Sequence, residues 1–177
     1  MEDFNRNELI ERLKRLDEEA YLLYGDDDRR FHLIIVGGGA LVLLEMITRS
    51  THNLDILDAS HELYGLMSKY DINGQVQTFI NNFPYNYLDR VTRLPVEGRI
   101  IDFYTASLED IVIAKLYSMR PSDRRDITDP KVLSMLDWNR LEHLAYDEDE
   151  AKASALNERL YKNFLLDYED YVKEYRP

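Results

Sequence analysis

The sequence predicts an α/β centre followed by a helical carboxyl-terminal part. Helical patterns and short strand-like runs alternate through the first half of the chain, two further runs flank a turn at 95–98, and apolar residues recur at helical spacing after 107. The chain has 177 residues, of which 45% are hydrophobic. That length and composition favour one domain with a sizeable core. We expect the principal part at 1–127 and a helical extension at 128–177.

The first half begins with an amphipathic helix at 7–24, whose apolar residues recur every three or four positions: Leu9, Leu13, Leu16, Ala20 and Leu23. A buried strand is expected at 31–36, because the run is apolar and ends at three consecutive glycines. A buried helix at 40–47 follows the glycines. Residues 53–57 alternate between polar and apolar, which predicts a half-buried strand with Asn53 and Asp55 on its polar face.

The later elements follow from turn and capping signals. We expect a helix at 61–70, a turn at Asn73-Gly74, and a hairpin of strands 89–94 and 99–104; the stretch 82–85 is not assigned. Ser107 and Asp110 resemble a capping box for a helix at 108–119. The carboxyl-terminal helix is predicted to bury a stripe of five residues, namely Leu156, Leu160, Phe164, Tyr168 and Val172.

Composition excludes several classes of function. Twenty-two basic against 34 acidic residues give a net charge of −12, which repels a nucleic-acid backbone, so stable DNA binding is not expected. The chain has no cysteine and therefore no disulfide, thiol nucleophile or cysteine zinc site. The amino terminus lacks the order of a signal peptide, and the longest apolar stretch, 33–44, is too short to span a bilayer. A cytoplasmic protein without membrane contact is expected.

Three features are candidates for chemistry. Gly37, Gly38 and Gly39 join a strand to a helix, where glycines are commonly only a tight turn, and they match neither the dinucleotide-binding pattern nor the P-loop. Asp55 at the polar strand face is open to a turn or capping role as well as to a functional one. Asp102 lies between apolar residues of a strand, and a carboxylate removed from water requires a metal or a basic partner.

The helix at 108–119 carries a fourth candidate. Lys115 lies in the middle of the apolar face of this helix. Two interpretations are open: its alkyl chain passes along the core to a surface carboxylate, or its ammonium pairs with the site carboxylates or a ligand phosphate. Arg120, Arg124 and Arg125 form the densest basic patch, which is either a solvated face or a site for triphosphate or RNA.

Taken together these residues resemble a known superfamily. The strand, the three glycines, a helix, the segment Arg49-Ser50-Thr51-His52-Asn53-Leu54-Asp55 and a strand carrying Asp102 resemble the nucleotidyltransferases of the DNA-polymerase-β type. The chain is more closely similar to the bacterial nucleotidyltransferase toxins of the AbiEii and MenT kind and to related uncharacterised nucleotidyltransferase families. Residues 107–116, with Lys115, and 120–127, with Asp126, resemble the second half of the pattern in those toxins.

The resemblance implies a small mixed sheet flanked by helices and the transfer of a nucleotide from an NTP, with pyrophosphate leaving. It assigns Mg²⁺ to Asn53, Asp55 and Asp102, which we therefore expect within a few ångströms of one another on adjacent strands. By the same resemblance the triphosphate is bound by Gly37, Gly38, Gly39, Thr51, Lys115 and Arg124. Asp55, Asp102, Lys115 and Asp126 are the implied catalytic residues, Asp126 orienting Lys115.

One position departs from the pattern. Asn53 stands where the family has its first aspartate, and a neutral amide oxygen is a weaker Mg²⁺ ligand than a carboxylate. The departure is either natural or a deliberate inactivation. The first hypothesis is thus an impaired toxin that modifies tRNA or protein and is neutralised by an antitoxin. The alternatives are a non-catalytic module that senses a nucleotide or docks a protein, and a regulatory domain that binds a protein through its acidic surface.

Overall fold

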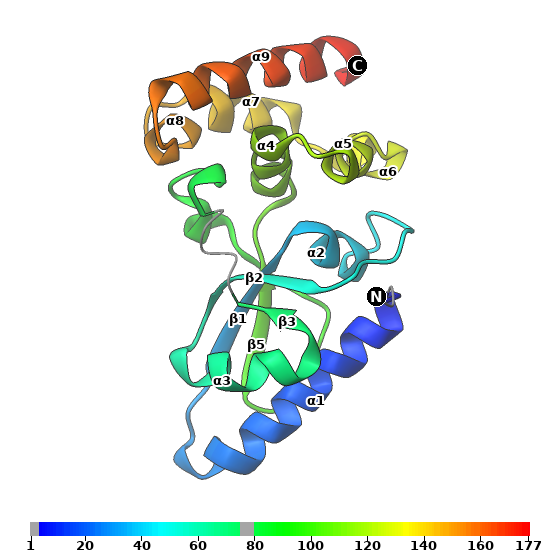
Figure 1. Cartoon of the computed structure of the whole chain (residues 1–177), viewed down its shortest axis with the longest axis vertical. Helices are drawn as coiled ribbons and strands as arrows, with labels where there is room; N and C mark the ends of the chain where they lie inside the picture. The colour runs from blue at the N-terminus through cyan, green and yellow to red at the C-terminus, as the bar shows by residue number, and fades with distance from the viewer. Residues whose placement is uncertain (1–3, 75–79) are drawn as a thin grey trace. The chain divides into compact units, whose positions relative to one another are not determined.

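A computed structural model describes residues 4–74 and 80–177 of the chain (Figure 1). The chain divides into two compact units: Met1–Gln77 with Val91–Thr105, and Thr78–Arg90 with Ala106–Pro177. The first contains the sheet and the second is helical, so the predicted α/β centre and helical carboxyl-terminal part are confirmed. The predicted division at 127/128 differs from this one, because the helices at 108–118 and 121–127 group with the second unit.

The first unit is built on a five-stranded mixed sheet in the order β3-β2-β1-β5-β4. The strands are β1 (Phe31–Val36), β2 (Leu54–Ala59), β3 (Ile72–Asn73), β4 (Thr92–Arg93) and β5 (Ile101–Thr105). Central β1 runs antiparallel to β2 and parallel to β5, while β2 pairs with β3 in parallel and β4 with β5 antiparallel. The pairing of β1 with β2 shifts register between Ile34 and Ile35. The sheet thus places β1 between the two strands that carry the predicted carboxylates.

Helix α1 (Arg6–Tyr24) confirms the first predicted helix. Asn5 and Glu8 form a reciprocal capping box at its start, which satisfies backbone N–H groups that the helix leaves unpaired. Leu9, Leu13, Leu16 and Ala20 are fully buried, whereas Leu23 is 58% exposed. The buried carboxylate of Asp17 accepts hydrogen bonds from three successive backbone N–H groups, those of residues 99–101. These bonds tie α1 to the start of β5.

The connections of the first unit differ from expectation in three places. The predicted helix at 61–70 is three short pieces, η2 (His61–Leu63), α3 (Tyr64–Met67) and η3 (Ser68–Tyr70). Asn73 of the predicted turn belongs to the edge strand β3. The predicted strand at 89–94 starts in the 3₁₀ turn η5 (Tyr87–Arg90), which belongs to the second unit, and only the two residues of β4 pair with β5. Short edge strands carry too few side chains to show an alternating pattern.

The second unit contains α4 (Leu108–Ser118), α5 (Pro121–Ile127), α6 (Pro130–Met135), α7 (Trp138–Tyr146), α8 (Ala151–Ser154) and α9 (Glu158–Tyr175). The expected capping of α4 is present, since the Ser107 hydroxyl accepts from the backbone N–H of Asp110 at 3.1 Å. Helix α4 contacts α5, α7 and α9, and Figure 1 shows these three helices next to α4. Within the described ranges no helix has both the length and the apolar character needed to cross a membrane.

The carboxyl-terminal helix forms as predicted, but its buried stripe is shifted. Its buried residues are Tyr161, Phe164, Tyr168 and Tyr171, whereas Leu156 just before the helix and Leu160 within it are exposed. The Tyr161 hydroxyl donates to the carbonyl of Ala145 at 2.9 Å. Tyrosines bury well when the hydroxyl finds an acceptor. The predicted stripe is therefore confirmed at Phe164 and Tyr168 and wrong at Leu156 and Leu160.

Candidate nucleotidyl-transfer site

The glycine turn packs against the segment from Arg49 to Asp55. Gly37 has φ +69°, a left-handed conformation that a side chain disfavours, and a Cβ placed on it would lie 3.2 Å from Asp55 Oδ2. A Cβ on Gly38 would lie 2.7 Å from Arg49 Nη2. The three glycines, expected as a turn before a helix at 40–47, are instead the first residues of α2 (Gly37–Leu43), which ends four residues earlier than predicted. The first two glycines allow a close approach between this helix and the polar side chains.

The third glycine extends the same contact. A Cβ on Gly39 would lie 2.9 Å from Leu54 Cδ2 and 3.3 Å from the backbone oxygen of Asn53. That oxygen accepts a hydrogen bond from the Thr51 hydroxyl at 3.2 Å. Thr51 is buried and pairs through two backbone hydrogen bonds with Phe4 in an antiparallel bridge. The glycines thus pack directly against the polar segment 49–55. The backbone of Phe4, near the amino terminus, pairs with the same segment at Thr51.

Asp55 lies half-buried on β2, opposite Val36 at the end of β1. Asn73 of β3 donates a hydrogen bond from Nδ2 to Asp55 Oδ1 at 3.3 Å. The Asp55 carboxylate is therefore oriented by a residue of the edge strand and lies beside the first glycine. Asn73 was expected only as a turn residue, so its position next to Asp55 is a finding of the structure.

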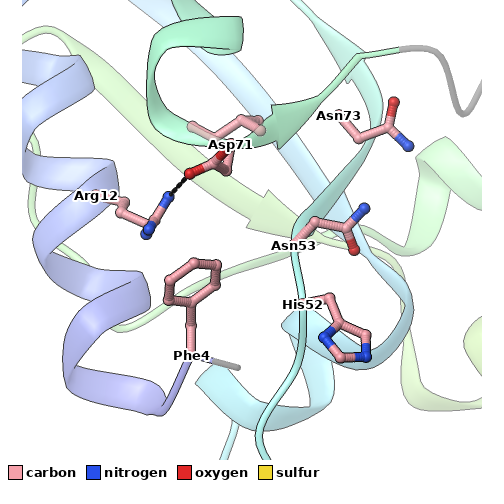
Figure 2. Close-up of a pocket in the computed structure, with 7 residues that line it drawn as sticks. Phe4, Arg12, His52, Asn53, Asp71 and Asn73 are labelled. Carbon is pink, nitrogen blue, oxygen red and sulfur yellow. Dashed lines mark hydrogen bonds and ion pairs between the residues drawn. The ribbon is translucent and has the colours of Figure 1, made fainter. Parts of the chain in front are cut away.

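Asn53 borders a cavity of about 440 Å³ (Figure 2). Besides Asn53 the described lining consists of Phe4, Arg12, His52, Asp71, Ile72 and Asn73. The guanidinium carbon of Arg12 lies 3.6 Å from the centre of the Phe4 ring. The Nη1 group of Arg12 donates to the Tyr70 carbonyl at 2.9 Å and pairs with the Asp71 carboxylate. The predicted site position Asn53 therefore opens onto a polar and aromatic cavity.

The expected closeness of Asp55 and Asp102 is wrong. Their strands are not adjacent, because β1 lies between β2 and β5. Asp55 is in register with Val36 and Asp102 with His32, four residues apart along β1. At about 3.3 Å per residue this separates them by about 13 Å along the strand direction alone. A carboxylate pair at that spacing does not share a metal ion.

Asp102 instead forms ion pairs with two arginines. Arg30 donates to it through Nε at 3.0 Å and through Nη2 at 2.7 Å, and Arg93 pairs with the same carboxylate. The hydrogen bonds from Arg30 hold the pKa of Asp102 below its ordinary value, against the opposing effect of burial. In the described ranges no three histidine, aspartate or glutamate side chains converge as a metal-binding group. The basic partner that Asp102 required is therefore a pair of guanidinium groups.

Lys115 lies in the second unit, buried between two carboxylates. Its Nζ donates to Asp123 Oδ1 at 2.7 Å and to Asp126 Oδ2 at 2.8 Å, and the residue is 5% exposed. Asp126 thus contacts Lys115 as expected, while Asp123 is a partner that the sequence analysis missed. Burial acts to raise the pKa of Asp123, but Lys115 and the hydrogen bonds from Arg120 and Ser118 lower it overall. Lys115 therefore has local partners on α5.

Comparison with known protein families shows the family to which the chain belongs. The model of a family described as "Nucleotidyltransferase of unknown function (DUF6036)" matches residues 11–176. The chain belongs to this family. The DUF6036 match spans both units, from α1 to the last residues of α9. Neither the search of curated proteins nor that of solved structures returned a match.

In this DUF6036 protein one arginine of the predicted basic patch is paired with a carboxylate. Arg120 donates from Nε to Asp123 Oδ2 at 2.7 Å. Arg124 borders a small cavity of about 70 Å³ whose lining also includes Asp167 and Asp170. Arg125 is exposed. The proposed roles of these arginines in triphosphate or RNA binding stay predictions.

The DUF6036 chain also has a charged cluster that the sequence analysis did not find. Arg90 pairs with Asp110 at 2.8 Å and with Glu150 at 2.9 Å, and Asp110 also accepts from the Ser107 hydroxyl at 2.6 Å. Burial acts to lower the pKa of Arg90, but hydrogen bonds to both carboxylates raise it overall. Its members come from three segments that are far apart in the sequence. A pattern of neighbouring residues could therefore identify only Asp110, as part of the cap of a helix. The cluster fixes η5 against the start of α4.

Proposed function

We propose that this protein transfers a nucleotide from an NTP to an acceptor at the site formed by Gly37–Gly39 and the segment 49–55. The observation that carries the proposal is the close packing of the three glycines on Arg49, Thr51, Asn53 and Asp55, since these are the positions of the family resemblance. Membership in a nucleotidyltransferase family supports it. In the reaction an acceptor oxygen bonds to the α-phosphorus while the bond to pyrophosphate breaks.

The residues of this chain would divide the work as follows. Backbone N–H groups at the glycine turn would bind phosphate oxygens. Arg49, beside Gly38, would supply positive charge to the phosphates. Asp55, oriented by Asn73, would face the reacting phosphate. Asn73 is thus a positioning residue.

The donor set fits one weakly held Mg²⁺ ion. Mg²⁺ is commonly bound by one or two carboxylates together with substrate phosphates, and Asp55 with the amide oxygen of Asn53 would form such a set. When bound, the ion would stabilise charge that develops on the phosphate oxygens. A two-metal site does not fit, because Asp102 lies elsewhere and is paired with two arginines.

The finer assignment within this proposal is a bacterial toxin that modifies tRNA or protein and is neutralised by an antitoxin in the cytoplasm. Its support is the resemblance of residues 49–55, 107–116 and 120–127 to the AbiEii and MenT toxins. The second candidate is a non-catalytic module that binds a nucleotide or a partner protein. Asn53 and the distant Asp102 favour this second candidate.

The test is the variant Asn53→Asp. Restoring a carboxylate adds charge at the ion site, and a transition-state gain of about 3–5 kcal/mol corresponds to a rate increase of about 10²- to 10⁴-fold. The two proteins would be incubated with Mg²⁺, total cellular RNA and each labelled NTP, and label incorporation into RNA and protein would be measured. Asn53→Asp with Asp55→Asn is the matched control, which should be inactive. Equal absence of transfer by all forms would favour the non-catalytic module.

A further inference from the structure

We propose that the cavity beside Asn53 binds a nucleobase, supplied either by the NTP or by the terminal nucleotide of an RNA acceptor. The inference rests on the proposed function and names the chemical group that the same site recognises. The cavity, of about 440 Å³, falls within the range typical of small-molecule sites. Figure 2 shows that its side chains come from the amino terminus, α1, the segment before β2, and the region of β3.

The aromatic wall of the cavity is fixed in place. Two backbone hydrogen bonds hold Phe4 to Thr51: its N–H donates to the Thr51 carbonyl at 2.7 Å and its carbonyl accepts at 3.1 Å. Arg12 packs its guanidinium on the Phe4 ring at 3.6 Å and is itself held by the Tyr70 carbonyl. Unpaired bases stack on aromatic rings and on guanidinium planes. Because the guanidinium covers one face of the Phe4 ring, a base would stack on the opposite face of the ring or on the outer face of the guanidinium.

The charge of the cavity favours a neutral ligand. Arg12 and Asp71 form an ion pair within the lining, so their formal charges cancel, and Phe4, Asn53, Ile72 and Asn73 carry no charge. A phosphate or an ammonium group would lack a net opposite charge here. A nucleobase is flat, neutral and rich in hydrogen-bonding groups, which matches this lining.

The polar rim supplies groups that read base edges. Asn53 carries an amide, which offers a donor and an acceptor side by side. Asparagine amides pair with adenine edges in nucleic-acid recognition. The family resemblance implies only a metal role for Asn53, whereas its place at the rim allows it to contact the base as well.

The position of the cavity connects it to the proposed chemistry. Asn73 lines the cavity and also donates to Asp55, and Asn53 lines it while its backbone oxygen lies behind Gly39. The described lining includes none of the three glycines. A nucleotide with its base in the cavity would therefore extend its sugar and phosphate past Asn73 toward Asp55 and the glycines beside it.

The experiment measures binding in the absence of Mg²⁺, so it does not depend on turnover. Calorimetric titrations would compare AMP, GMP, CMP and UMP with ribose 5-phosphate, which carries the phosphate without a base. At least one nucleotide should bind more tightly than ribose 5-phosphate, and Phe4→Ala should weaken that binding by about 10- to 100-fold. Phe4→Tyr keeps the ring and should retain the affinity, while Leu22→Ala, at an 83% exposed position of α1, is the matched control.

Two further measurements complete the experiment. One uses a variant that keeps an apolar side chain at position 4, and the other compares NTP binding with RNA binding. Phe4→Leu keeps an apolar side chain for packing and should weaken base binding as Phe4→Ala does. A loss confined to NTP binding assigns the base to the NTP, and a loss confined to RNA with an intact 3′ nucleotide, compared with an abasic end, assigns it to the acceptor. Either result supports the inference. Equal binding of the nucleotides and ribose 5-phosphate, or unchanged affinity in both Phe4→Ala and Phe4→Leu, overturns it whatever the outcome of the Asn53→Asp assay.

Discussion

Buried charges in this protein are satisfied by partners that lie far away in the sequence or on the next helix. Lys115 and Asp102 were both identified from one anomaly, a charged side chain among apolar neighbours. In each case the requirement for a partner was correct, because an unpaired charge removed from water is costly. Asp102 is paired with Arg30 and Arg93, and Lys115 with two aspartates of α5.

The Lys115 ion pairs should make this residue important for stability. Lys115→Ala leaves the buried carboxylates of Asp123 and Asp126 without their ammonium, so we expect it to lower the free energy of unfolding by about 3–5 kcal/mol. Urea unfolding followed by circular dichroism measures this. Lys152→Ala, which removes an exposed lysine paired with Glu148, should leave stability nearly unchanged. A Lys115→Ala protein as stable as the original, but with weakened NTP binding, would instead support the ligand role that the family resemblance implies for Lys115.

At the scale of elements, the glycine turn and the shifted stripe of α9 illustrate two kinds of packing. The turn lacks side chains so that the polar segment can approach, and Asp55, Arg49 and Leu54 occupy that space. On α9 the buried face is aromatic, with Phe164 stacked on Tyr117 at a centroid distance of 4.3 Å and an interplanar angle of 8°. The hydroxyl of Tyr171 donates to the Ile127 carbonyl at 2.6 Å. Hydrogen bonding allows these tyrosines to replace leucines in the core.

Substitutions along α9 test which face is buried. Phe164→Ala should lower the free energy of unfolding by about 3–5 kcal/mol, because it leaves a cavity beside Tyr117. Tyr171→Phe removes one buried hydrogen bond and should cost about 0.5–1.5 kcal/mol. Leu166→Ala, at a 62% exposed position, should change stability little. Chemical denaturation of the three variants gives the order, and a larger loss from Leu166→Ala than from Phe164→Ala would contradict the structure.

At the scale of the whole molecule, acidic charge dominates. The net charge of −12 is spread over both units, and the densest basic segment, 120–125, is partly paired with carboxylates. Long-range repulsion therefore opposes contact with a phosphate backbone. Recognition of an RNA acceptor would have to use specific local groups, such as those of the cavity beside Asn53, instead of a general basic surface.

Duplex DNA should accordingly bind poorly. Fluorescence anisotropy with a labelled random duplex at about 0.15 M salt should show no saturation below about 100 µM protein, weaker than the usual range of non-specific binders. A triple variant with Arg120, Arg124 and Arg125 changed to Glu serves as the control and should behave alike. Micromolar binding that weakens steeply with salt, and that the triple variant loses, would contradict this expectation.

The sequence by itself determined the elements whose patterns are local. The spacing of leucines gave α1, the apolar run before the glycines gave β1, the alternation after Asn53 gave β2, and the Ser107 cap gave the start of α4. Only the tertiary structure decided the strand order, which separates Asp55 from Asp102, and the choice of tyrosines as the buried face of α9. The physical reason is that periodicity and capping depend on residues a few positions apart. Strand order, ion pairing and the acceptors of buried hydroxyls depend on which distant segments meet.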